Sequence, residues 1–268
     1  MPEPQLFQSA RLKIKRTYEH IDQLGAAIDG FVRGDFYDLV IQSDPDDVFH
    51  DVLKLIPKPL PDVVSLAAGD AVHNLRSALD HAMWESIFLG TGVTPSETSA
   101  TNFPIRQDYE KLVQAIQGTE IEGAGPDIIG LILNELTPYD GGNDPLRALH
   151  RMDMADKHRL LIPIVSFTSV EDVWLEDERG ESFPAPFLSM GGFSDAPTGI
   201  GIGKGLKMTP GGWRVGNGFK VKNKGQATIQ VIFGVGNALG YTPVLPTLHQ
   251  LAQLVTAIVD QFEQKLLV

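Results

Sequence analysis

Residues 70–84 gather two histidines, two aspartates, an asparagine, an arginine and a serine in an otherwise aliphatic stretch. Histidine and aspartate act as general acids and bases, and arginine stabilises negative charge that develops during a reaction. The segment, Asp70-Ala-Val-His-Asn-Leu-Arg-Ser-Ala-Leu-Asp-His-Ala-Met-Trp84, is therefore the candidate site. Its candidate catalytic residues are His73, Asn74, Arg76, Ser77, Asp80 and His81.

Helical periodicity divides this segment into two faces. At about 100° per residue, one polar face covers about a third of the helix circumference and is centred on Asn74, Ser77 and His81. Its members are Asp70, His73, Asn74, Ser77, Asp80, His81 and Trp84. The small and aliphatic residues form the stripe by which an amphipathic helix joins a core. They are Ala71, Leu75, Ala78, Leu79, Ala82 and Ser86. We therefore expect a two-faced helix whose polar face carries the site.

The spacing between Arg76 and His81 is Arg-x4-His. On these residues, the stretch from Asp62 to Leu89 resembles the HEPN superfamily, helical-bundle proteins whose active members carry Arg-x(4 to 6)-His and cleave RNA without metal, usually as dimers. The resemblance implies that His81 is the acid or base that assists attack by a ribose 2′-hydroxyl, and that Arg76 stabilises charge on the phosphate. It implies a homodimeric endoribonuclease without a cofactor, in a toxin or phage-defence setting.

The same resemblance gives supporting roles to neighbouring residues. Ser77 takes the polar position after the arginine, and Asp80 or Asn74 orients His81. Because Arg76 and His81 are five residues apart, their side chains diverge by about 140° around a helix. They converge only if the arginine wraps around the helix or a partner chain contributes. Residues 74–81, Asn-Leu-Arg-Ser-Ala-Leu-Asp-His, are also similar to uncharacterised bacterial proteins, which bring no known activity.

A non-catalytic role for the polar face is the alternative hypothesis. Arg76 then pairs with Asp80, and His73 and His81 bond to backbone or carboxylate groups, so that the cluster pins helices together. In this hypothesis the face from Asp70 to Trp84 holds a ligand, a metal or a partner protein.

The histidine spacing disfavours a metal site on this helix alone. His73 and His81 lie eight residues apart, about 12 Å along a helix axis, which is too far for one ion to bind both. A second helix with His150 and Asp153 on adjacent turns is available to add ligands. The chain nevertheless has no His-Glu-x-x-His or Glu-x-x-His pattern, so we expect no metal.

The charge of the chain is uneven along the sequence. The net charge of −12 disfavours general affinity for nucleic acid, because phosphate binding depends on lysine and arginine. Residues 196–259, however, contain no aspartate or glutamate. Their basic residues are Lys204, Lys207, Arg214, Lys220, Lys222 and Lys224. We expect this basic face either to meet RNA or another phosphate-bearing ligand, or to pack against the acidic remainder or a partner chain.

Composition also bears on the cellular compartment. The chain has no cysteine, which excludes disulfides and thiolate chemistry and fits a reducing cytoplasm. It starts with Met-Pro-Glu-Pro-Gln-Leu-Phe, unlike a secretory signal, and no stretch approaches the roughly 18 apolar residues of a membrane span. We therefore expect a cytoplasmic protein. The glycine-rich run 198–205 lacks the Walker spacing, because Thr198 stands where the first glycine belongs, so we expect no nucleotide cofactor.

The pattern of elements predicts an α+β fold, a helical bundle with a β-rich, glycine-rich insertion before the C-terminal helix. The expected helices cover 8–33, 62–89, 109–117, 126–136, a stretch from 144 and 247–267. The expected hairpins pair 36–42 with 48–56, and lie within 219–233 with a turn at Asn223-Lys-Gly225. We expect a mainly helical domain over 1–160, including a short β hairpin, then a β-rich insertion over 161–244. The C-terminal helix, 245–268, returns to the bundle.

Overall fold

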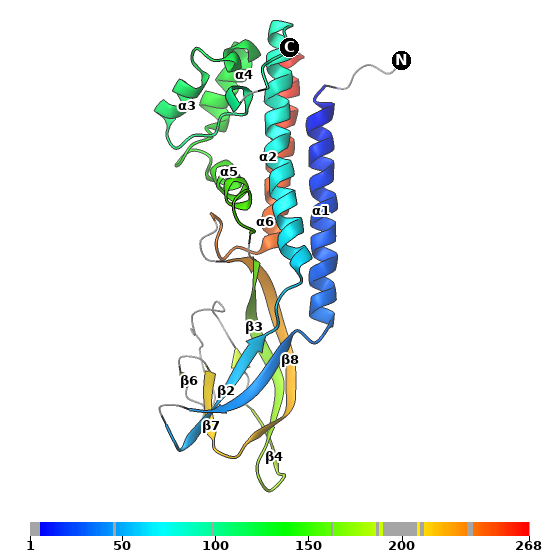
Figure 1. The fold of residues 1–268 in the computed structure, drawn as a ribbon, viewed down its shortest axis with the longest axis vertical. Coiled ribbons are helices and arrows are strands. Elements are labelled where there is room, and N and C mark those ends of the chain that lie inside the picture. The colour runs from blue at the N-terminus through cyan, green and yellow to red at the C-terminus, as the bar shows by residue number, and fades with distance from the viewer. Residues whose placement is uncertain are drawn as a thin grey trace. The chain divides into compact units, whose positions relative to one another are not determined.

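The computed structural model describes residues 6–44, 47–97, 99–161, 163–185, 188–189, 208–209, 212–234 and 238–267. Within these residues the chain forms six α-helices and two small antiparallel sheets, which confirms the α+β class (Figure 1). Its contacts divide the chain into two compact units. The helical unit comprises residues 1–25, 63–162 and 235–268, and the β unit comprises residues 26–62 and 163–234.

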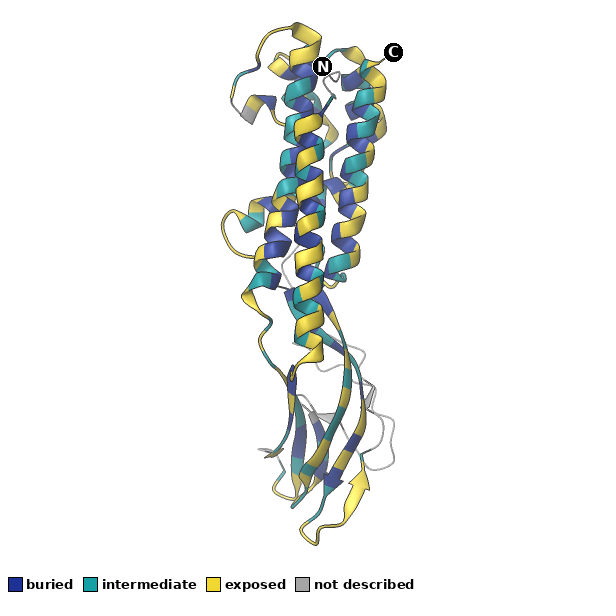
Figure 2. Ribbon diagram, turned by 90° about the vertical axis from the view of Figure 1, so that its right-hand side faces the viewer, coloured by how far each residue is buried: buried dark blue, intermediate teal, exposed yellow. Residues whose placement is uncertain are grey.

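Three long helices frame the helical unit: α1 (Gln8–Arg33), of which residues up to Gly25 belong here, α2 (Asp62–Thr91) and α6 (Val244–Leu266). Figure 2 shows buried residues on one side of these helices and exposed residues on the other, as amphipathic helices require. Phe7 and Phe103 pack on Phe262 of α6, with ring centroids 6.3 and 6.1 Å apart. These aromatic contacts join α6 to the start of α1 and to the segment after α2.

The segment between α2 and the β unit folds into short helices. They are η1 (Ser99–Thr101), α3 (Tyr109–Ile116), η2 (Glu120–Ala124), α4 (Pro126–Gly130), η3 (Leu131–Leu136) and α5 (Asp144–Asp156). Local side chains fix where two of them begin, because Asp108 accepts from the Lys111 N–H at 2.8 Å and Asn143 accepts from the Leu146 N–H at 3.2 Å. Pro145 follows at the first turn of α5, where its missing N–H costs no hydrogen bond.

The stretch 126–136, expected as one helix, changes its hydrogen-bond pattern midway. α4 is an α-helix, whereas η3 is a π-helix that ends where Thr137 adopts a left-handed φ of 42°. Ile128, Leu131 and Ile132 are buried on both sides of the change, so the apolar face continues across it.

The β unit contains two sheets. The first has the order β1-β2-β7-β6, and the second joins β4, β3 and β5, with β8 also paired to β3. The strands are β1 (Tyr37–Ser43), β2 (His50–Pro57), β3 (Pro163–Glu176), β4 (Ser182–Pro184), β5 (Leu188–Ser189), β6 (Met208–Thr209), β7 (Gly212–Gly216) and β8 (Lys220–Phe233). A buried cluster that includes Tyr37, Leu53, Phe167, Val170 and Trp213 forms the core of this unit.

The β1–β2 hairpin forms as the sequence predicts, with Tyr37 opposite Pro57 and Ser43 opposite Asp51. The free side of β2 pairs with β7, Leu53 lying opposite Trp213. Contacts therefore group this hairpin with the later strands, whereas the sequence pattern grouped it with the helices.

The hairpin expected within residues 219–233 is wrong, because this stretch is the single strand β8. β8 pairs with β3 from Pro163 opposite Phe233 to Glu176 opposite Lys220. Gly225 does have a left-handed φ of 71°, and Asp172 on β3 has a φ of 57°. The register is the same on both sides of these two residues, from Glu171 opposite Gln226 to Val173 opposite Lys224. The positive φ values therefore lie inside a continuous ladder and do not reverse the chain.

None of the described helices combines the length and the apolar character that a membrane span requires. The glycine-rich run 198–205 lies outside the described residues.

Candidate functional site

Helix α2 carries the candidate site without interruption, and its expected apolar stripe is confirmed. Ala71, Leu75, Ala78, Leu79 and Ala82 are each 0% exposed. Ser86, at the end of this stripe, is also buried, and its hydroxyl donates to the Ala82 carbonyl at 2.8 Å. Because this face is fixed in the core, the polar residues are held on the other sides of α2.

Arg76 does not lie on the open polar face; it is 7% exposed. Its Nη1 forms an ion pair with Asp80 Oδ1 at 2.7 Å, one turn along α2, but makes no hydrogen bond with the described residues. Its Nη2 donates to the Phe103 carbonyl at 2.9 Å. Asp80 Oδ1 in turn accepts from the Phe103 N–H at 2.9 Å. We name these three residues the arginine clamp. The expected Arg76–Asp80 pair is thus confirmed, and both charges also bind the backbone of Phe103.

Burial raises the pKa of Asp80, although the Arg76 charge and the Phe103 N–H oppose this shift. Desolvation disfavours a charged carboxylate, whereas an adjacent guanidinium favours it. The Asp80 side chain keeps 25% of its surface exposed and reaches the pocket described below. The carboxyl group of Asp80 is therefore committed to the clamp and is partly available to a ligand.

His73 binds a buried carboxylate of another helix. Its Nδ1 lies 2.9 Å from Oδ1 of Asp153 on α5, and Asp153 is 1% exposed. The other oxygen of Asp153 lies 2.7 Å from the Lys157 ammonium. On its open side, His73 Nε2 lies 3.5 Å from the Ser77 hydroxyl. This cluster links α2 to α5, and it confirms the expectation that His73 bonds to a carboxylate.

The two residues expected to orient His81 do not contact it. The Asn74 amide donates to the Asp70 carbonyl of its own helix at 2.8 Å, and Asp80 belongs to the arginine clamp. Among the described residues, no hydrogen bond reaches His81. Burial, together with the charge of Lys13, lowers the pKa of His81. The imidazole is therefore neutral at pH 7 and free to donate or accept one hydrogen bond at each nitrogen.

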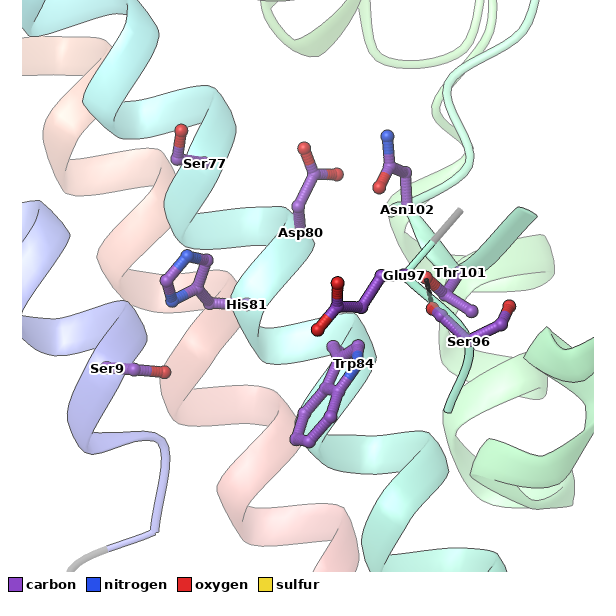
Figure 3. A pocket seen from close by; sticks show the side chains of 9 residues that line it. All are labelled: Ser9, Ser77, Asp80, His81, Trp84, Ser96, Glu97, Thr101 and Asn102. Atoms are coloured by element: carbon purple, nitrogen blue, oxygen red, sulfur yellow. Dashed lines mark hydrogen bonds between the residues drawn. The ribbon is translucent and has the colours of Figure 1, made fainter. Parts of the chain in front are cut away.

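His81 opens into a pocket of about 670 Å³ within the helical unit (Figure 3). Its lining residues are Ser9 of α1, Ser77, Asp80, His81 and Trp84 of α2, and Ser96, Glu97, Thr101 and Asn102 of the following segment. The described part of this wall offers hydroxyls, an amide, two carboxyl groups, an imidazole and an indole, but no lysine or arginine. The sequence did not reveal Ser9 of α1 or the lining residues after α2, and those after α2 lie in a connecting segment without periodicity.

Behind the clamp lies a second group of basic residues that the sequence did not reveal. Burial and the positive charges of Arg76, Arg147 and Arg106 lower the pKa of His150. The buried Nδ1 of His150 has no hydrogen-bond partner among the described residues. Arg147 binds Asp140, with Nε–Oδ1 at 3.0 Å. Arg106 donates to the adjacent Ile105 carbonyl at 3.0 Å and has no carboxylate partner among the described residues. Burial, then the charges of Arg76 and Arg147, lower the pKa of Arg106.

The expected basic face of residues 196–259 is partly neutralised within the β unit. Lys204 and Lys207 lie outside the described residues. The ion pairs of the face join Arg214 to Asp44 at 2.7 Å, Lys222 to Glu176 at 2.9 Å and Lys224 to Asp35. Lys220 forms no ion pair with the described residues. These pairs match the alternative expectation, in which the basic residues pack against acidic ones.

The described residues contain no group of three or more histidine, aspartate or glutamate side chains placed to hold a metal ion. His73 and His81, the two histidines on α2, have separate surroundings, since only His73 meets Asp153.

No protein-family model, curated protein or solved structure matches this chain. The resemblances to the HEPN superfamily and to uncharacterised bacterial proteins thus remain predictions that rest on residues 62–89. A function for the site has to be argued from its geometry.

Breaking the arginine clamp should destabilise the helical unit. Arg76→Met leaves the Asp80 carboxylate and the Phe103 carbonyl without their cation, and we expect the free energy of unfolding to fall by about 3–5 kcal/mol. The double variant Arg76→Met/Asp80→Leu removes both charges and should recover part of this loss. Urea unfolding followed by circular dichroism measures both. As a control, Arg16→Met removes the exposed Arg16–Glu19 pair and should change stability by less than about 1 kcal/mol. Equal effects of Arg76→Met and Arg16→Met would contradict the clamp.

The environment of His150 predicts that stability decreases in mild acid. Burial, then the charges of Arg76 and Arg147, lower the pKa of His150 to about 4, and Asp153 opposes this shift weakly. An unfolded chain binds this proton near pH 6.5, so between about pH 6.5 and 4 the unfolded state holds more protons and stability falls as pH falls.

We expect the His150 contribution to be roughly 2 kcal/mol between pH 7 and 4, and His150→Gln should remove it. Urea unfolding of the wild type and of His150→Gln across this pH range measures how steeply the free energy of unfolding of each protein depends on pH. A midpoint near pH 6.5 in an NMR titration of the His150 ring protons of the folded protein would contradict this prediction.

Proposed function

We propose that this protein binds a small organic cation in the pocket beside Trp84. The observation that carries the proposal is that the described lining residues include an unpaired carboxylate and an indole but no basic side chain. Glu97 forms no ion pair with the described residues, so its charge is available to a ligand. An indole face attracts cations through its quadrupole, most strongly where water is partly excluded. The polar helix face predicted from the sequence thus acts as a ligand site in this proposal.

The other lining residues support a cation over an anion. His81 is neutral and accepts a hydrogen bond from an ammonium group, while the hydroxyls of Ser9 and Ser77 offer further acceptors. A phosphate or carboxylate ligand needs arginine, lysine or backbone N–H donors, and it would meet Glu97 and Asp80 instead. The net charge of −12 also attracts cations to the protein from a distance.

Choline is the probe for this proposal, and its uncharged isostere 3,3-dimethyl-1-butanol is the matched control ligand. We expect choline to bind measurably in isothermal titration calorimetry, and Glu97→Gln to weaken its binding by about tenfold or more, because a hydrogen bond or ion pair to a charged group is lost. Trp84→Ala should weaken binding by about threefold to tenfold. Trp174→Ala and Glu110→Gln, which change residues that do not line the pocket, should leave binding unchanged. Equal binding of the two ligands, or tighter binding of inorganic phosphate, would overturn the proposal.

Metal-independent cleavage of RNA by a homodimer is a second candidate, and His81 is the residue that favours it. A neutral imidazole that is open to a pocket and has no hydrogen bond from the described residues suits a general base that takes a proton from a ribose 2′-hydroxyl. Arg76 is bound within the clamp, so its role becomes structural. The cation that stabilises the phosphate then has to come from the second chain, as the HEPN resemblance implies.

The ribonuclease candidate predicts cleavage of single-stranded RNA in EDTA with 2′,3′-cyclic phosphate ends. His81→Ala should lower the rate by about a hundredfold or more, the usual contribution of a general base. His249→Ala, an exposed histidine of α6, is the control and should cut at the wild-type rate. Gel analysis of a labelled RNA measures both. The candidate fails if the wild-type protein leaves the RNA intact or if His81→Ala cuts equally well.

A further inference from the structure

Ser77, His73 and Asp153 are linked by two successive contacts within the helical unit. The Ser77 Oγ lies 3.5 Å from His73 Nε2, and His73 Nδ1 lies 2.9 Å from Asp153 Oδ1. Asp153 is 1% exposed, and its second oxygen binds Lys157 at 2.7 Å. A hydroxyl, an imidazole and a buried carboxylate in this order are the parts of an activated serine nucleophile.

The buried carboxylate determines which nitrogen of His73 carries the proton. A carboxylate only accepts hydrogen bonds, so Nδ1 of a neutral His73 donates to Asp153 and Nε2 holds the free electron pair. Nε2 is the atom that faces the Ser77 hydroxyl. The imidazole is thus oriented to accept the hydroxyl proton, and the separation of 3.5 Å is in the range of catalytic pairs that tighten when substrate binds.

Regular structure holds these groups in place. Ser77 and His73 are one turn apart on α2, whose opposite face is fixed in the core. Asp153 belongs to α5, where its neighbours Leu149 and Met152 are 0% exposed. Half of the His73 side chain is exposed, at 51%, so water has access to it. Ser77 also lines the pocket, as does Asn102, whose amide carries N–H donors of the kind that stabilise an oxyanion.

From this arrangement we propose that Ser77 is the nucleophile of an acyl-transfer reaction that hydrolyses small carboxylic esters. The Ser77 Oγ attacks the acyl carbon while its proton passes to His73 Nε2. The ester C–O bond then breaks, and His73 returns the proton to the departing alkoxide, which leaves an acyl-serine and a free alcohol. Water then attacks the acyl carbon while His73 Nε2 takes one of its protons. The bond between the acyl carbon and Ser77 Oγ breaks, and His73 returns the proton to Oγ, which releases the carboxylic acid and restores Ser77.

Asp153 acts in this scheme as a positioning residue, because it touches His73 and not the substrate. The proposal rests on the pocket of the proposed function for holding the substrate, since Ser77 is part of its wall. The reaction itself needs neither Glu97 nor Trp84. A probe without a cation therefore separates the nucleophile from the binding of cations.

A fluorophosphonate is the test probe, since it is attacked by an activated serine with loss of fluoride and leaves a stable adduct. We expect peptide mass spectrometry to find the adduct on Ser77 of the wild-type chain. Ser77→Ala should remove it, and His73→Gln should slow labelling by about a hundredfold or more. Ser65→Ala, on the same helix outside the pocket, should be labelled at the wild-type rate. Circular dichroism confirms that each variant is folded.

Hydrolysis of p-nitrophenyl acetate tests the positioning role of Asp153. Asp153→Asn should lower kcat with little change in KM, and Asp153→Glu should restore part of the loss, which a merely structural role would not produce. An unlabelled wild-type protein, or equal labelling of wild type and His73→Gln, would overturn the inference. If Ser77 is labelled although choline does not bind, the cation proposal fails and the nucleophile stands. If choline binds and Ser77 is not labelled, the nucleophile proposal fails and the cation proposal stands.

Discussion

The buried arginine clamp is the interaction on which the rest of the helical unit depends. A guanidinium that is 7% exposed needs an anion and carbonyl acceptors, and Arg76 obtains both from Asp80 and the Phe103 carbonyl. Satisfying these charges fixes the chain after α2 against the helix. The residues just before Phe103 form the far wall of the pocket. A requirement of buried charge therefore determines the shape of the candidate site.

The buried carboxylate of Asp153 likewise holds a neighbouring element, α5, against α2. Asp153 meets both His73 and Lys157, so α5 is held to α2 through a charged group that has left water. Removing either His73 or Lys157 would leave the buried Asp153 carboxylate without one of its partners and would strongly lower the stability of the fold. The same hydrogen bond orients the His73 ring toward Ser77. His73 therefore has both a structural and a chemical role. His81 has no hydrogen bond with the described residues and stays available to a ligand.

The charges that remain after internal pairing set the chemistry of the pocket. Arg76 is bound within the clamp, and Lys222 and Lys224 meet carboxylates in the β unit. Glu97 keeps an unpaired charge on the pocket wall among the described residues. The site consequently presents negative charge, although the residue types of its helix first indicated a phosphate ligand. Pairing inside the fold, more than residue type, decides which charges a ligand meets.

The sequence by itself determined what depends on near neighbours along the chain. The apolar stripe of α2, the start of α5 at Asp144 and the Arg76–Asp80 pair follow from one-turn spacing and from local helix-start signals. Tertiary structure decided the rest. Phe103 joins Asp80 across 23 residues and Asp153 joins His73 across 80 residues, so both partners depend on how helices pack. Likewise, Gly225 reads locally as a turn, but pairing with β3 keeps β8 extended, because satisfying a whole ladder of backbone hydrogen bonds outweighs one residue's preference.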